Sequence, residues 1–342
     1  MADSDERAPS DRMRERGPHS QRWLWVVLDA DRRLVAAGIL AVLFAATVAV
    51  GTLLPTPAFL LLTEGDPHET LFNALVGSTI TGVTLVLTLS QLVLSQELGA
   101  AGDQRERMEG AMAFRDAASD AAGVAVAPAE PSAFLRALVE ATSEQANALA
   151  DAAPGGDAGD AVAEYADAVV ENARVVANQL EGAQFGTFEV VLAALNYNYS
   201  WKIYAGERLR AEYGDALDDD AHAALDDLLE TLELFGPARE HFKTLYFQWE
   251  LSELSRTLLY AAVPALGASM VGLLLFDPAQ YPGATLGVSH ALVGVAAAAT
   301  VAVLPFALLL AYILRIITVT KRTLSIGPFV LRETERNADI DD

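Results

Sequence analysis

The sequence contains no cysteine, and it is poor in lysine. Without cysteine, disulfides, thiolate nucleophiles and cysteine-ligated metal sites are all excluded. Lysine occurs only at positions 202, 243 and 321 among the 23 basic residues. The chain has a formal net charge of −23, so it lacks the basic surface that nucleic-acid binding requires. We therefore expect no nucleic-acid partner.

The sequence also lacks the short motifs that mark common enzymes. Its five histidines are far apart, and none has the spacing of a metal site. No Gly-rich phosphate loop, nucleophile elbow or kinase motif occurs. The aspartates at 218–220 lack the glycine and the spaced ligands of a calcium loop, and a solvated helix end explains them. We predict a protein that is not an enzyme and needs no metal or cofactor.

Hydrophobic residues nevertheless make up 52% of the chain. This fraction and the strong negative charge agree if the apolar residues are concentrated in membrane segments and the acids lie elsewhere. Dense carboxylates keep a surface hydrated in concentrated salt, whereas long lysine stems add apolar surface. The composition is typical of salt-adapted, haloarchaeal-type proteins.

Four stretches are apolar enough and long enough to cross a bilayer, which takes about 20 helical residues. Two of them precede a long acidic region, and two follow it, so they pair naturally as two hairpins. Charged residues and prolines lie at their ends rather than within their central parts, except for Pro264 and Pro305. Their approximate limits are 34–54, 71–94, 257–276 and 287–314.

The distribution of basic residues predicts the topology. Arginine and lysine are frequent in 1–33 and 315–342, and they are absent from the hairpin loops 55–70 and 277–286. Because basic loops stay on the cytoplasmic side, both termini and the middle region are expected to be cytoplasmic. We predict a multi-pass protein of the cell (inner) membrane.

The middle region is acidic and has helical periodicity throughout. Proline and glycine interrupt this pattern, and no strand-like alternation persists. The expected helices cover 103–121, 132–152, 158–182, 187–213, 217–235 and 237–256. The fold class that follows is an all-α integral membrane protein, with four transmembrane helices in two hairpins and an inserted cytoplasmic helical bundle.

This reading divides the chain into six segments. Composition places a disordered tail before an interfacial segment that carries two tryptophans and ends in two arginines. The predicted order is a disordered N-terminal tail (1–20), an interfacial helix (21–33), the first transmembrane hairpin (34–97), the acidic cytoplasmic helical domain (98–256), the second transmembrane hairpin (257–314) and a cytoplasmic C-terminal tail (315–342).

A stripe of polar and small residues runs along the second apolar stretch, which has no charge between Glu69 and Glu97. At about 100° per residue, eight positions fall in one wedge about 80° wide, and no apolar residue lies inside it. Polar groups that face lipid are costly, so this wedge should contact water or protein. The eight positions are Thr70, Asn73, Gly77, Thr81, Thr84, Thr88, Gln91 and Ser95.

Two interpretations of this stripe stay open. In the first, the chain is a homo-oligomeric, channel-like pore protein, and copies of the stripe line an aqueous path. In the second, the chain is a non-catalytic membrane scaffold or sensor. The stripe is then an intramolecular or dimer packing face, with threonine hydroxyls bonded to carbonyls four residues earlier. The acidic domain would then recruit a cytoplasmic protein partner. Both interpretations place the chain in a lipid bilayer, and we expect it to self-associate.

Two further features belong to these interpretations. Glu64, Asp66 and Glu69 lie at the outer end of the stripe, and in the pore interpretation they form a vestibule that attracts cations. Pro264 and Pro305 lie within the third and fourth spans, where a proline frees a carbonyl and kinks a helix.

The plan of two membrane hairpins around a long cytoplasmic helical domain resembles that of the bestrophin channels, in which the second span lines a ring-shaped pore. The resemblance implies a pore around the second span here. It carries over no site residue, because threonine and glutamine replace the aromatic constrictions of that family's pore helix. The stretch GSTITGVTLVLTLSQLVLSQELG is also similar to the second span of uncharacterised prokaryotic membrane proteins.

Overall fold

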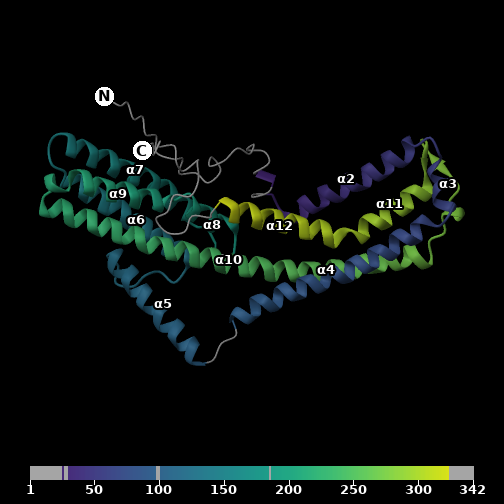
Figure 1. The fold of residues 1–342 in the computed structure, drawn as a ribbon, viewed down its shortest axis with the longest axis horizontal. Helices are drawn as coiled ribbons and strands as arrows, with labels where there is room; N and C mark the ends of the chain where they lie inside the picture. The colour runs from purple at the N-terminus through teal and green to yellow at the C-terminus, as the bar shows by residue number, and fades with distance from the viewer. Residues whose placement is uncertain (1–24, 27–29, 98–100, 185, 323–342) are drawn as a thin grey trace. The chain divides into compact units, whose positions relative to one another are not determined.

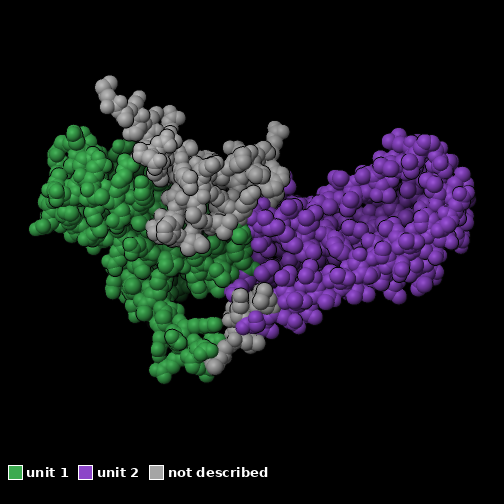
Figure 2. Space-filling view, viewed as in Figure 1, with its two compact units in different colours: residues 1–21, 99–247, 319–342 green, residues 22–98, 248–318 purple. Residues whose placement is uncertain are grey.

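The computed structural model describes residues 25–26, 30–97, 101–184 and 186–322. These residues are almost entirely α-helical (Figure 1), which confirms the predicted all-α fold. The chain divides into two compact units (Figure 2). Unit 1 comprises 1–21, 99–247 and 319–342, and unit 2 comprises 22–98 and 248–318.

Unit 1 is a helical bundle built from the acidic middle of the chain. Apolar residues recur every three or four positions on its helices, and these faces meet in one core. Tyr197 and Phe235 are among its largest fully buried side chains. Its elements are α5 (Ala101–Ala121), α6 (Pro131–Asp151), α7 (Asp157–Leu180), α8 (Phe188–Leu195), α9 (Tyr199–Tyr213), the 3-10 helix η2 (Gly214–Ala216) and the first part of α10 (Asp219–Leu274).

The predicted single helix over 187–213 is wrong, because the chain breaks between α8 and α9. Asn196 caps α8, and its side-chain amide donates to Gln179 Oε1 at 3.0 Å. Tyr197, directly after it, is completely buried. Asparagine has a low helix propensity, and here it ends α8 while its side chain bonds to a residue of α7.

The predicted break at Gly236 and Pro237 is also wrong, because α10 continues through both residues. Gly236 permits a close contact instead: a Cβ atom there would lie 2.8 Å from the ring of Tyr199. Pro237 costs the helix one hydrogen bond. The burial of Phe235 and Ala238 on either side offsets that loss.

Unit 2 contains the apolar helices. Three helices among the described residues, α2, α4 and α10, are long and apolar enough to cross a membrane, and α11 with α12 makes a fourth if this bent pair is one span. The elements are α2 (Arg32–Leu53), α3 (Ala58–Thr63), α4 (Pro67–Glu97), the last part of α10, η3 (Pro278–Gln280), the two-residue strands β1 (Ala284–Thr285) and β2 (Val288–Ser289), α11 (His290–Ala302) and most of α12 (Leu304–Arg322).

Within unit 2, α4 and the last part of α10 pack along each other in opposite directions (Figure 1). The ring of Phe72 lies against Gly272 at one end, and Ser90 bonds to Ser255 further along. The small residues Gly272, Ser90 and Ser255 at these contacts let the two helices approach closely. This packing determines which face of α4 remains open.

The two prolines of the predicted spans have different surroundings. Pro305 stands in the first turn of α12, where its missing N–H has no helical partner to lose. The axis turns by 48° between α11 and α12, just before this proline. Pro264 lies inside α10, and that helix continues to Leu274.

Both ends of the chain extend beyond the described part. The predicted tail 1–20 and the tryptophan at 23 of the interfacial segment lie outside it, as do residues 323–342. Arg32 and Arg33, predicted to end the interfacial segment, form the first turn of α2. The helix α12 continues past Arg315 as far as Arg322.

Candidate functional site: the polar face of α4

The structure places all eight stripe residues on an open surface. Every one of them is exposed in the single chain. Among the described residues, no other part of the chain covers the stripe. From Thr70 to Ser95 the stripe extends for about 37 Å along the helix, which exceeds a hydrocarbon core about 30 Å thick.

The stripe lies opposite the face that α4 packs against its own chain. Among the positions of α4 whose burial the structure describes, the buried ones are His68, Phe72, Thr79 and Val86. They recur every four or seven positions, and at about 100° per residue their mean direction is roughly 160° from that of the stripe. One face of α4 thus packs against its own chain, and the opposite face, which carries the stripe, is open.

Three threonines of the stripe already use their hydroxyl protons within the helix. Thr81 donates to the carbonyl oxygen of Gly77 at 2.9 Å, Thr84 donates to that of Ile80 at 2.9 Å, and Thr88 donates to that of Thr84 at 3.0 Å. Because their donors are satisfied, these threonines are less costly to desolvate than free hydroxyls. Their oxygen lone pairs remain directed outward to accept hydrogen bonds.

The two amide side chains of the stripe need hydrogen-bond partners outside their own helix. Asn73 and Gln91 are both exposed. Within the described part of the chain, neither side-chain amide has a hydrogen-bond partner. Each amide carries two donors and an acceptor, and leaving such a group unpaired in hydrocarbon costs about 4–8 kcal/mol. Something polar must cover them in a membrane.

The acidic residues of the first hairpin loop stand at the N-terminal end of α4. Glu64, Asp66 and Glu69 are all exposed. Gly65 and Asp66 both have positive φ, at 79° and 50°, and this turn leads the chain from α3 into α4. His68 next to them is buried, with its ring edge-on to Phe276 at 6.3 Å between centroids. The carboxylates thus crowd one end of the stripe.

Metal ligation has no visible basis in this region. No group of three or more His, Asp or Glu residues among the described positions could hold a metal ion. The chemistry that the stripe offers is therefore hydrogen bonding by hydroxyl and amide groups, with carboxylates at one end.

Sequence reasoning missed a buried polar cluster in unit 1. Lys202 is only 4% exposed, and its ammonium group donates to Asn172 Oδ1 at 2.9 Å and lies 4.9 Å from the ring centre of Tyr197. Tyr165 donates to the carbonyl oxygen of Lys202 at 3.0 Å, and burial raises the pKa of Tyr165. The scarcity of lysine in the chain was the one signal that could have drawn attention to this position.

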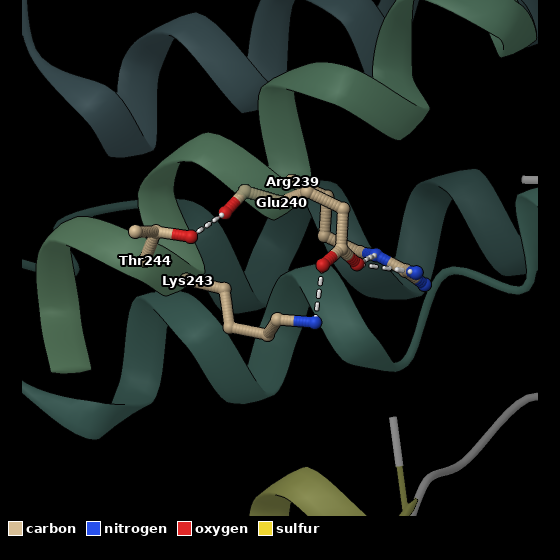
Figure 3. Close-up of polar contacts among 4 residues, drawn as sticks. All are labelled: Arg239, Glu240, Lys243 and Thr244. Atoms are coloured by element: carbon tan, nitrogen blue, oxygen red, sulfur yellow. Dashed lines mark hydrogen bonds and ion pairs between the residues drawn. The ribbon is translucent and has the colours of Figure 1, made fainter. Parts of the chain in front are cut away.

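A second charged group was also missed, on the part of α10 that belongs to unit 1. Glu240 pairs with Arg239 at 2.8 Å and with Lys243, and Thr244 donates to its carbonyl oxygen at 2.9 Å (Figure 3). Arg239 is 4% exposed and lies 4.6 Å from the ring centre of Tyr199. The contacts of Glu240 lie within α10, and of these contacts only the cation–π contact of Arg239 with Tyr199 joins α10 to α9, so we assign this group to the stability of the bundle.

Comparison with known proteins gives a match to one protein-family model and none to individual proteins. The model described as "Family of unknown function (DUF7972)" matches residues 1–342. No curated protein matches the chain. No solved structure matches it either.

Proposed function

Since the chain belongs to the DUF7972 family, whose function is unknown, we propose from its structure that it is a subunit of a homo-oligomeric membrane pore. The polar stripe of α4 lines this pore. The observation that carries the proposal is that all eight stripe residues are exposed, on the side of α4 opposite its buried residues.

Several copies are needed because one helix cannot enclose water. In a lone subunit the amides of Asn73 and Gln91 would face hydrocarbon, at a high free-energy cost. A ring of subunits that turns each α4 stripe toward a common axis places these amides in water. The bonded threonine hydroxyls between them then present oxygen atoms to the path.

The proposal includes a topology. The four spans are α2, α4, the last part of α10, and α11 with α12, arranged as two hairpins with the acidic bundle between them on the cytoplasmic side. The support comes from the basic residues of 1–33 and 315–342 and from the hairpin loops without basic residues. Both termini then lie in the cytoplasm of a cell whose inner membrane holds the protein.

The solute is a small ion, with a weak preference for cations. Hydroxyl and amide groups carry no net charge, so the stripe itself discriminates little. The exposed Glu64, Asp66 and Glu69 would raise the local concentration of cations at the outer mouth.

Cysteine scanning tests the proposal directly, because the chain has no cysteine of its own. Thr81→Cys, Thr84→Cys and Thr88→Cys should react with a charged, membrane-impermeant thiol reagent in the assembled protein. Leu85→Cys and Leu87→Cys serve as matched controls. Both leucines are exposed in the single chain but lie outside the stripe, so they should stay unlabelled in lipid. A monomeric protein with unreactive stripe cysteines would refute the pore.

A second candidate function is a non-catalytic scaffold or sensor in which the stripe packs between copies. One observation favours it: no atom of another element lies within 4 Å of where a Cβ of Gly77 would be, so a second helix could approach there. In that case Thr88→Leu would prevent assembly. In a pore, the same substitution would leave assembly intact and reduce conductance.

A further inference from the structure

Unit 2 contains a groove that is lined by two arginines and by apolar residues. None of these residues lies on α4. The groove has a volume of about 430 Å³ and lies among α2, α10 and α12. Arg33 and Arg256 stand at one end. Ala36, Leu40 and Leu308 are among the residues that line the rest.

The arginines near this groove differ in whether their guanidinium groups already have partners within the chain. Arg32 pairs with the buried Glu250 and lies over the ring of Tyr312, and Arg315 is buried and donates to the carbonyl oxygen of Ala30 at 2.9 Å. Arg33, by contrast, is exposed. Among the described residues, its guanidinium makes no hydrogen bond or ion pair.

The other charges of the groove leave a positive excess. Arg256 is 62% exposed and pairs with Glu253 at 2.5 Å. Glu253 pairs with Arg256, whereas Arg33 has no ion-pair partner among the described residues and so presents a positive charge at the mouth. The site therefore complements one negative charge.

The polarity of the groove changes along the helices. From Arg33 to Leu40 on α2, and from Arg256 to Pro264 on α10, the lining passes from charged to apolar within about 10–12 Å. Arg33 lies in the first turn of the candidate span α2, and Arg256 directly precedes the charge-free stretch 257–276 of α10. Tyr260, exposed at 73%, borders the groove between the two zones, where aromatic residues favour the membrane interface.

We propose that this groove binds an anionic phospholipid of the surrounding bilayer. The phosphate accepts hydrogen bonds from Arg33 and Arg256, and an acyl chain lies on Ala36, Leu40 and Leu308. The site requires that the spans lie in a bilayer, as the proposed function does, but it involves no residue of the α4 stripe.

Lipid titration of the full-length protein in mild detergent, followed by native mass spectrometry, tests the site. Phosphatidylglycerol should bind more tightly than phosphatidylcholine with the same acyl chains. One arginine near a membrane surface contributes enough for Arg33→Gln to weaken phosphatidylglycerol binding about fivefold. Arg33→Lys should retain most of the affinity.

Two further variants test the charge and the apolar floor separately. Glu253→Gln removes the competing anion, so it should strengthen phosphatidylglycerol binding, which no loss of folding could mimic. Ala37→Trp fills the groove from an exposed position and should weaken binding of both lipids. The matched controls are Arg105→Gln on α5 and Ala45→Trp on α2. Both residues are exposed outside the groove and should change nothing.

Three results would overturn the site. Equal binding of the two lipids would remove the role of the arginines. Competition by inorganic phosphate alone, at concentrations similar to those of the lipid, would indicate a simple anion site. A change of oligomeric mass in Ala37→Trp without a change in lipid binding would show that a second copy occupies the groove. Thr88→Leu, which tests the pore, should leave lipid binding unchanged.

Discussion

Ser90 on α4 and Ser255 on α10 share a hydrogen bond of 2.7 Å between their hydroxyl oxygens. Ser90 Oγ also lies 3.0 Å from the carbonyl oxygen of Val86, and Ser255 Oγ lies 2.8 Å from that of Leu251. Three contacts thus share two protons, so one serine donates to the other helix while its partner donates to its own. This polar contact is on the packing face of α4, away from the stripe.

Replacing either serine should cost little, because the partner can turn its proton to its own helix. We expect Ser90→Ala and Ser255→Ala each to lower the free energy of unfolding by about 0.5–1 kcal/mol, with a coupling of about 0.6 kcal/mol. A double-mutant cycle measured by denaturant unfolding in detergent checks this. Additive effects would contradict the hydrogen bond.

The close contact between Phe72 and Gly272 predicts that a side chain larger than that of glycine does not fit at position 272. A Cβ at Gly272 would lie 2.5 Å from the ring of Phe72, so Gly272→Ala should push α4 away from α10 and destabilise the protein by about 1–3 kcal/mol. Gly267 is the matched control on the same helix. A Cβ there meets nothing within 4 Å, so Gly267→Ala should be neutral or stabilising. Thermal unfolding of both variants distinguishes the two positions.

The ion pair of Arg32 with Glu250 predicts that Arg32 and its neighbour Arg33 contribute very differently to the stability of the protein. Glu250 is 2% exposed, so Arg32→Ala removes an ion-pair partner from a buried carboxylate and should destabilise the protein by about 3–5 kcal/mol. Arg33→Ala should change stability by less than about 0.5 kcal/mol without added anionic lipid. Equal unfolding temperatures for the two variants would contradict the assigned roles.

The amide of Gln91 gives the pore proposal a further test. We expect Gln91→Leu to leave the oligomeric state unchanged and to lower single-channel conductance several-fold in planar bilayers, because an apolar ring in the path resists wetting. Leu94→Gln, at an exposed position outside the stripe, is the control and should not raise conductance. If Gln91→Leu dissociates the oligomer instead, the stripe is a packing face.

The buried hydroxyl of Tyr165 predicts an effect confined to the helical bundle. Tyr165→Phe removes the hydrogen bond to the carbonyl oxygen of Lys202 and should cost about 1 kcal/mol. Tyr204→Phe is the control, since Tyr204 is 39% exposed. The measurement is the unfolding temperature by circular dichroism, and equal losses in both variants would contradict the assignment.

The sequence by itself determined the all-α fold, the apolar helices and the polar wedge of α4. These features follow from local composition and from the 3.6-residue period, which need no partner to be recognised. It did not determine whether Gly236 and Pro237 would end a helix. That outcome depended on packing against other helices, which buries Phe235 and Ala238 and places Tyr199 on Gly236.

Only the tertiary structure decided which way the stripe faces. A sequence shows that Thr70 to Ser95 share one side of a helix, but not which side the rest of the chain covers. The contacts of Phe72 with Gly272 and of Ser90 with Ser255 fix the rotation of α4, and they leave the stripe exposed on the opposite side. Packing between segments far apart in sequence decides such rotations, because it depends on the combined shape of both surfaces.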